Sequence, residues 1–242
     1  DALRAPGWTF VGPKQTFDTD GQTVVTWQTN IYCIDIAASD PQVLYAGGET
    51  GGLWRSADKG QNWVLLTQSV LHGSFGAVKI HPANPAIVYA ATGGKIIKTT
   101  DAGSSWTTVY SENGLWVNEL AISPLDPNIV LAASDQGLLR TINAGGAWSK
   151  VHTQQTWTVK FRASTNTVFT ARKSGSGSDF RISTDGGATF NNSNTGWWIP
   201  GAGEECTGVM LATCPSNPTK LYAYIIGSGA NLKGYVGVFV SN

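Results

Sequence analysis

An eight-residue segment recurs four times in this 242-residue chain and constrains the possible folds more than any other feature. Successive copies begin 43, 42 and 42 residues apart. Every copy has Ser or Thr first, Asp or Asn third, Gly fifth, and Trp or Phe eighth. A near-constant step of this length indicates a fold built from one repeated unit. The residues at the four positions are Ser56, Asp58, Gly60 and Trp63; Thr99, Asp101, Gly103 and Trp106; Thr141, Asn143, Gly145 and Trp148; and Ser183, Asp185, Gly187 and Phe190.

The residues between the copies predict short β-strands. In the second unit, apolar runs at Ala77–Ile80, Ile87–Ala90 and Gly94–Lys98 are separated by turn residues, and a further run follows Trp106. Runs of this length that are bounded by Gly, Pro, Asn and Asp are typical of strands. Four short strands in about 42 residues form one blade of a β-propeller. The sequence therefore predicts an all-β propeller of four-stranded antiparallel blades, with between four and five blades.

Composition excludes two classes of partner. The chain has 16 basic and 16 acidic residues, and charged residues make up 13% of it. A neutral, charge-poor surface argues against nucleic acid as a partner. No apolar run approaches the roughly 18–20 residues of a membrane span, so we expect no direct membrane insertion.

The repeat also predicts how the chain is divided. We expect residues 1–242 to form one partial propeller, in which the fifth unit is incomplete and a fifth eight-residue segment would begin at Ser241. Trp8–Pro13 reads as an outer strand without its own blade. These features predict an open arc, cut from a longer protein that supplies further blades of the same polypeptide as partners. The expected segments are 1–30 for the outer strand and linker, and 31–68, 69–111, 112–153, 154–195 and 196–242 for blades one to five.

The eight-residue segment resembles the Asp box, or BNR-like repeat, of sialidases, sortilin-type receptors and endo-xyloglucanases, and the resemblance covers essentially the whole chain. It implies a structural role for the segment, distant from any active site. We expect the Asp or Asn side chain to accept backbone N–H groups two residues on. We expect the Gly to adopt a positive φ and the aromatic ring to pack between blades.

Functional side chains are expected at the opposite end of the blades. On a propeller, the connections between strands two and three and between successive blades emerge on the face away from the Asp boxes. Aromatic rings beside amides and acids in these loops suit a sugar or peptide partner. The candidate ligand-binding residues are Glu49, Trp116, Trp157, Trp197, Trp198 and Glu204. The alternative is that these rings are structural: Trp116 and Trp157 would pack at the starts of inner strands, and packing is equally open for Trp197 and Trp198.

One loop raises the alternative of an enzyme. Tyr45–Arg55 resembles the first-blade loop of endo-xyloglucanases, which implies that Glu49 would occupy the place of a catalytic Asp. A glycosidase needs two carboxylates, and in that family the second comes from a separate propeller. We therefore expect no catalytic residue, with a xyloglucanase-like polysaccharide endo-hydrolase as the alternative. A sialidase is disfavoured because Arg55, Arg140 and Arg181 occupy one framework position of the repeat.

No cofactor and no metal is expected. The chain lacks a phosphate- or dinucleotide-binding glycine pattern between a strand and a helix, and its three histidines show no ligand spacing. The three cysteines are expected to be free thiols. Cys206 and Cys214 would lie ~26 Å apart on one strand, whereas a disulfide needs Cα atoms about 4.4–6.8 Å apart.

The whole pattern predicts a non-catalytic binding or adhesion module that recognises a polysaccharide or a protein. The resemblance implies an exported or cell-surface bacterial protein. Gly7–Pro13 is similar to the opening segment of large surface proteins that the type IX secretion system carries.

Overall fold

The computed structural model describes residues 16–17, 24–25, 30–66, 73–229 and 232–241. Within these residues every helix-or-strand element is a β-strand, which confirms the all-β prediction. A small hairpin pairs β1 (Thr16–Phe17) with β2 (Val24–Val25). The expected outer strand at Trp8–Pro13 lies outside the described residues.

The remaining strands form five antiparallel sheets in chain order, here called blades 1 to 5. Within every blade each strand pairs with the next one along the chain. Blade 1 holds β3 (Ile31–Ile36), β4 (Leu44–Gly48), β5 (Leu53–Ser56) and β6 (Val64–Leu65). Blade 2 holds β7 (Phe75–His81), β8 (Asn84–Thr92), β9 (Lys95–Thr99) and β10 (Thr107–Ser111).

Blades 3 and 4 also have four strands, and blade 5 has three among the described residues. Each blade lies within one of the segments expected from the repeat. Blade 3 holds β11 (Val117–Ile122), β12 (Val130–Ser134), β13 (Gly137–Thr141) and β14 (Ser149–His152). Blade 4 holds β15 (Thr156–Phe161), β16 (Val168–Ser174), β17 (Gly177–Ser183) and β18 (Asn191–Asn192). Blade 5 holds β19 (Glu204–Thr213), β20 (Leu221–Gly229) and β21 (Leu232–Ser241).

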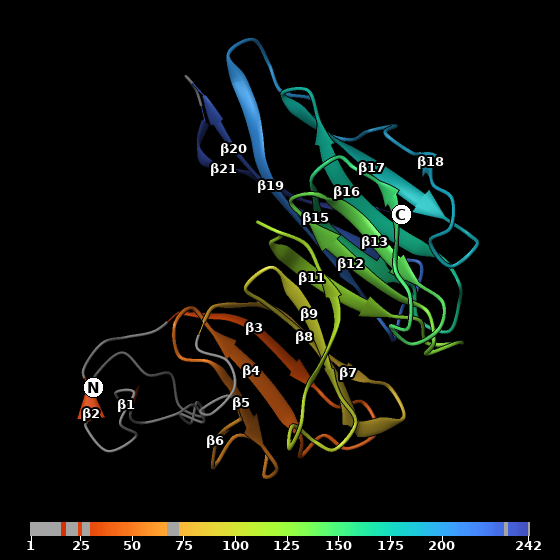
Figure 1. The fold of residues 1–242 in the computed structure, drawn as a ribbon. Helices are drawn as coiled ribbons and strands as arrows, with labels where there is room; N and C mark the ends of the chain where they lie inside the picture. The colour runs from red at the N-terminus through yellow and green to blue at the C-terminus, as the bar shows by residue number, and fades with distance from the viewer. Residues whose placement is uncertain (1–15, 18–23, 26–29, 67–72, 230–231, 242) are drawn as a thin grey trace.

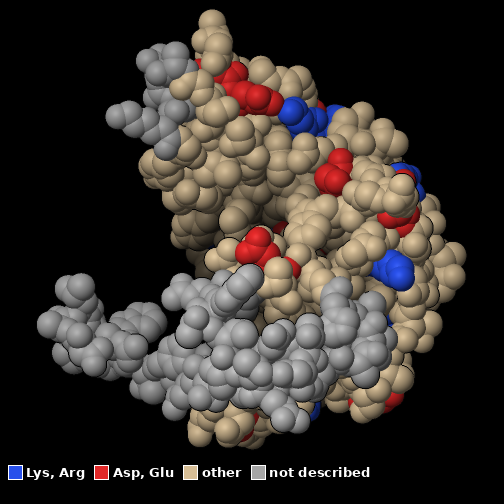
Figure 2. All heavy atoms as spheres, turned by 60° about the vertical axis from the view of Figure 1, so that its left-hand side comes forward, with Lys and Arg blue, Asp and Glu red and all other residues tan. Residues whose placement is uncertain are grey.

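The blades follow one another around an arc, from β3–β6 in orange to β19–β21 in blue (Figure 1). The first strands of successive blades lie together, because β3 contacts β7, β7 contacts β11, β11 contacts β15, and β15 contacts β19. In the space-filling view the described residues curve around a hollow, with charged side chains scattered among uncharged ones (Figure 2).

The hydrophobic core is divided into four clusters, one between each pair of successive blades. Strand alternation explains this division, because neighbouring side chains of a strand point to opposite faces of the sheet. Tyr89 of β8 belongs to the cluster shared with blade 3, whereas Val88 and Ala90 belong to the cluster shared with blade 1. Each internal blade thus buries both of its faces.

The Asp boxes form the turns between the third and fourth strands. Their first residue is buried and accepts a hydrogen bond from the backbone N–H of the Gly, as Thr99 Oγ1 does from Gly103 N at 3.0 Å. The expected acceptor was wrong. The N–H of Gly103, two residues after Asp101, donates to Thr99 Oγ1, and Asp101 Oδ1 instead accepts a hydrogen bond from Ser105 N, four residues on, at 2.9 Å. The hydroxyl of Thr99 completes the turn by donating to Asp101 Oδ1.

The expectation for the Gly is met in every box, and that for the aromatic ring in three of the four. The Gly of every copy has a positive φ, between 81° and 93°. A Cβ on Gly103 would lie 2.6 Å from Leu66 Cδ1 of the preceding blade, so space also requires glycine there. Trp106, Trp148 and Phe190 each pack, partly buried, against the cluster between their own blade and the preceding one.

Candidate functional site

At the end of the blades away from the Asp boxes, backbone hydrogen bonds join the end of the second strand to the connection that leads into the first strand. In three blades an N–H at the end of the second strand, or directly after it, donates to the carbonyl of the residue directly before the first strand. The pairs are Glu49 N with Asn30 O at 2.8 Å, Asp135 N with Trp116 O at 3.0 Å, and Lys173 N with Gln155 O at 2.8 Å. These bonds place candidate residues from different loops on one face.

A β-bulge interrupts the first strand of every blade near this face. The irregularities lie between Ile31 and Cys33, Phe75 and Ala77, Val117 and Glu119, Thr156 and Thr158, and Cys206 and Gly208. A bulge re-aims a side chain relative to the regular alternation of the strand. The bulged positions hold Tyr32, Gly76, Asn118, Trp157 and Thr207.

Two of these bulges bring Tyr32 of blade 1 against Trp116 of blade 3. The ring centroids lie 6.1 Å apart with an interplanar angle of 84°, an edge-to-face contact. Gly76, the bulged residue of the intervening blade 2, makes the contact possible. A Cβ at Gly76 would lie 2.4 Å from Val117 O and 3.0 Å from Trp116 Cζ2. Both rings remain exposed, Tyr32 by 46% and Trp116 by 36%.

Glu49 lies beside this aromatic pair. Asn30 Nδ2 donates to Glu49 Oε2 at 2.6 Å, and the Ser74 hydroxyl donates to the Glu49 backbone carbonyl. A hydrogen bond to the Glu49 carboxylate raises the pKa of the Tyr32 hydroxyl. Glu49 and Trp116, two of the candidate ligand-binding residues, thus meet through Tyr32.

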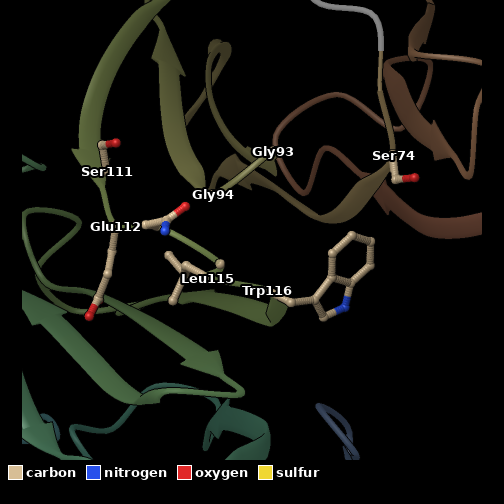
Figure 3. A pocket seen from close by; sticks show the side chains of 9 residues that line it. Ser74, Gly93, Gly94, Ser111, Glu112, Leu115 and Trp116 are labelled. Carbon is tan, nitrogen blue, oxygen red and sulfur yellow. The ribbon is translucent and has the colours of Figure 1, made fainter.

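A hollow of about 550 Å³ adjoins Trp116 and Ser74 between blades 2 and 3. In the close view the Ser74 hydroxyl and the Trp116 indole lie at the same end of it, with Gly93 and Gly94 along its side (Figure 3). The backbone of Trp116 is fixed by a hydrogen bond, which its N–H donates to Asp135 Oδ1 at 2.8 Å. The hollow therefore has one aromatic wall and several backbone and hydroxyl groups.

Glu112 is the acidic residue among the side chains that line this hollow. Its carboxylate already has two partners, the Tyr110 hydroxyl at 2.7 Å and Lys150 Nζ at 2.5 Å. These hydrogen bonds, with that from Lys150 the larger, lower the pKa of Glu112. Its side chain extends away from Trp116 (Figure 3). Glu112 therefore supports the loop and is not a free acid facing the hollow.

The other candidate residues lie at blades 4 and 5 and do not join this site. Trp157, Trp197 and Trp198 are partly buried against the cluster between those blades. Trp197 stacks on Phe180 at 5.2 Å between centroids, and its Nε1 donates to Ser178 Oγ at 2.9 Å. Glu204 Oε2 accepts the Gly201 N–H at 2.8 Å, which closes its own turn. Each of these side chains has a structural partner.

Asn30, Tyr32 and Ser74 belong to the site although the sequence analysis did not select them. The sequence indicates only that Tyr32 belongs to an apolar first strand. No sequence pattern predicts the bulge that turns its side chain toward Trp116. Asn30 carries a weak signal, since an amide directly before a first strand recurs at Gln155.

The described residues contain no group of three or more His, Cys, Asp or Glu side chains that could hold a metal ion. Nor does the described part of the chain include a helix that is long and apolar enough to cross a membrane. Cys33, Cys206 and Cys214 are free thiols, which confirms that Cys206 and Cys214 are not bridged.

With this geometry established, comparison with known proteins identifies the repeat. The family model described as sortilin, neurotensin receptor 3 (Sortilin-Vps10) matches residues 51–196, more than half of the chain. The chain belongs to the Sortilin-Vps10 family. A comparison of the sequence with curated proteins found no match.

Solved structures show the same propeller architecture. A GH74 enzyme from Niastella koreensis has a TM-score of 0.64 at 18% identity, covering 86% of this chain and 35% of the enzyme. The GH74 xyloglucanase of Xanthomonas campestris has a TM-score of 0.63 at 17% identity, covering 91% and 39%. YCF48 bound to D1 peptide has a TM-score of 0.57 at 15% identity, covering 89% and 72%. Our Sortilin-Vps10 chain thus spans little more than a third of the GH74 enzymes, and at these identities the likeness shows the fold alone.

Proposed function

We propose that this chain is a non-catalytic binding module that recognises a polysaccharide at the Tyr32–Trp116 pair. The observation that carries the proposal is the exposed edge-to-face contact of these two rings above Gly76, beside Glu49 and an adjoining hollow. Rings of this kind offer a flat apolar face for the C–H side of a sugar, while nearby polar groups fix its orientation.

The polar groups around the rings suit neutral hydroxyls. Glu49 and the backbone groups of Asn113 and Gly114 offer acceptors, and Ser74 offers a hydroxyl at the rim. The chain has no net charge, so it provides no field that favours a strongly charged partner. A neutral or weakly acidic glycan therefore fits better than a highly charged chain.

The absence of catalysis is part of the proposal. Hydrolysis of a glycoside needs two carboxylates across the scissile bond, one of them protonated to act as the acid. Glu49 supplies one carboxylate. Glu112 is held by Tyr110 and Lys150 with a lowered pKa, which is the opposite of what a general acid needs.

We further propose that the module acts outside the cell, as part of an exported or surface protein. The charge-poor, Gly-rich composition and the Asp-box repeat support this placement.

Binding of the full chain to a panel of soluble neutral and acidic polysaccharides by affinity electrophoresis and calorimetry tests the function. Trp116→Ala should lower affinity at least tenfold, which corresponds to about 1.4 kcal/mol. Trp198→Ala, a matched loss of an indole at blades 4 and 5, should leave the affinity unchanged. Glu49→Gln should keep binding, and no variant should release reducing ends.

Three outcomes contradict the proposal. If the chain binds none of the polysaccharides, the proposed class of ligand is wrong. Loss of binding in Trp198→Ala but not in Trp116→Ala moves the site to blades 4 and 5. Release of reducing ends that depends on Glu49 replaces the binding module with a hydrolase.

A further inference from the structure

A second hollow, of about 350 Å³, lies where blade 2 meets the third Asp box, at the end of the blades opposite to the Tyr32–Trp116 pair. Ligand pockets have volumes of about 300–1,000 Å³, so the hollow is large enough for a small ligand. Blade 2 contributes Lys98 and three hydroxyl side chains to its lining, and blade 3 contributes residues 143–146. Among the described residues that line it, none is acidic.

Lys98 is a partly buried cation that pairs with no carboxylate in the described part of the chain. Its ammonium donates to Ala144 O at 2.9 Å and lies 5.3 Å from the centroid of the Tyr89 ring. Other partly buried lysines pair with an acid, as Lys79 does with Asp35 at 2.8 Å. Burial without a paired charge disfavours the charged form of an amine, and burial lowers the pKa of Lys98. An anion in the hollow would supply the opposite charge that this ammonium lacks.

The same contact one blade further on lies beside an acid. Arg140 holds the repeat position of Lys98, and its Nε donates to the fourth residue of the next box, Gly186 O, at 2.9 Å. The third residue of that box is Asp185, whereas the box beside Lys98 carries Asn143. The negative charge that the other three boxes share is therefore missing beside the partly buried lysine.

The amide of Asn143 presents its nitrogen away from its own turn. Asn143 Oδ1 accepts the Ala147 N–H at 2.8 Å, so the NH₂ group occupies the other side of the amide. In the other boxes this second atom is an oxygen that accepts a side-chain donor four residues on, as Asp101 Oδ2 does from the Ser105 hydroxyl at 2.6 Å. Ala147 has no such group, and a Cβ at Gly146 would lie 3.1 Å from Asn143 Nδ2, so glycine leaves the amide uncovered. Asn143 Nδ2 has no hydrogen-bond partner among the described residues, and its donors are available to a ligand.

We propose that this hollow binds a hexuronic acid, whose carboxylate takes its charge partner from Lys98 and N–H donors from Asn143. A carboxylate accepts hydrogen bonds at both oxygens, and its strongest ones come from charged donors. The exposed hydroxyls of Thr100 and Thr107 lie around the same hollow and suit the ring hydroxyls of a sugar. The site is separate from the polysaccharide site at Tyr32 and Trp116, and it does not depend on that proposal.

The acid of the second box does not occupy these donors. Hydrogen bonds from the Ser105 hydroxyl, the Ser105 N–H and the Thr99 hydroxyl, in that order, lower the pKa of Asp101 to about 2. The Asp101 carboxylate thus has its partners within its own turn.

An NMR titration of the full chain, labelled with ¹⁵N at asparagine, tests the proposal with sodium glucuronate as the probe. The side-chain amide resonance of Asn143, identified by its loss in Asn143→Asp, should shift and saturate, whereas glucose should leave it in place. Lys98→Met removes the charge, and should weaken glucuronate binding at least tenfold. In that variant Ala144 O keeps the Tyr89 hydroxyl as a donor at 2.9 Å. Lys95→Met, at the exposed other end of β9, is the matched control and should bind like the wild type.

Asn143→Asp gives the third box the residue that the other boxes carry, so the turn should fold with an unchanged melting temperature. The added carboxylate repels the ligand, and calorimetry should detect no binding of glucuronate by this variant. An oligogalacturonate that binds more tightly than free galacturonate would identify the end of a polysaccharide as the ligand, and equal affinities would identify the free sugar acid. Either result supports the site.

Four results overturn the proposal. The first is an Asn143 amide that does not shift with glucuronate. The second is equal binding of acetate and glucuronate, which indicates a site for any small anion. The third is tighter binding of a short peptide through its C-terminal carboxylate. The fourth is an affinity for glucuronate that Lys98→Met leaves unchanged.

Discussion

The two tyrosines that share one position of the repeat, Tyr89 and Tyr222, should differ sharply when each is replaced by Ala. Tyr89 is 1% exposed and its ring lies between blades 2 and 3. Removing a fully buried aromatic side chain leaves a cavity and costs about 3–5 kcal/mol. Tyr222 is 43% exposed, so it loses only part of the roughly 1.5–3 kcal/mol of a full burial, about 1 kcal/mol, and opens no cavity. Urea unfolding of both variants, beside the wild type, measures the two changes.

The hydroxyl of Tyr89 accounts for a small share of this cost. It donates to Ala144 O at 2.9 Å, but Lys98 Nζ donates to the same oxygen at 2.9 Å, so the acceptor keeps a partner in Tyr89→Phe. The Phe variant should therefore lose only about 0.5–1.5 kcal/mol. Equal shifts of the urea midpoint for Tyr89→Ala and Tyr222→Ala, with unchanged slopes, would refute the assignment of these positions to buried and free blade faces.

Three further predictions follow from other parts of the arc. Trp106→Ala should lower stability by about 3–5 kcal/mol because its ring packs between blades, whereas Glu49→Gln should change it by less than ~0.5 kcal/mol; thermal melts compare them. Burial first, and nearby guanidinium groups second, lower the pKa of His152 to about 4. The unfolded state therefore takes up a proton first, and stability that is full above pH ~6.5 should fall as the pH drops towards 4, by at most about 3 kcal/mol; His152→Gln should flatten that part of the curve. Cys214, with a lowered pKa, should react with a maleimide before Cys33, whose burial raises its pKa to about 12, and mass spectrometry of timed samples gives the order.

The fold was predictable because one local pattern sets both the strands and their packing. The Ser or Thr hydroxyl and the positive φ of the Gly in each Asp box act within a single turn, so these two roles can be predicted without knowledge of distant residues. Strand number followed from the spacing of the boxes, and it agrees with the four four-stranded blades and the three-stranded fifth. The prediction for the box was wrong at one point: Asp101 Oδ1 accepts the N–H of Ser105, four residues on, because the nearer N–H of Gly103 donates to Thr99 Oγ1.

The candidate site was predictable only in part, since it depends on contacts between blades. Glu49 and Trp116 were selected from their loops, but Tyr32 joins them through a bulge and through the missing side chain of Gly76. Trp197 shows the opposite case. Its loop position left a free ring and a packed ring both open, and in the structure it contacts Phe180 and Ser178 of blade 4. Both outcomes depend on three-dimensional neighbours that a single repeat does not encode.

The bulge in each first strand has a consequence for how such a protein can diversify. Beyond the bulge, the rest of each first strand must keep its register with the second strand. A shift by one residue would exchange the two faces of the strand. At the bulge itself the five blades carry Tyr, Gly, Asn, Trp and Thr, residues of very different size and polarity. The bulge thus separates a chemically varied rim from an interior position that is aliphatic in all five blades. Successive blades can therefore carry different side chains at the equivalent bulged position. A new binding specificity would require substitutions at these positions only, with the packing between blades unchanged.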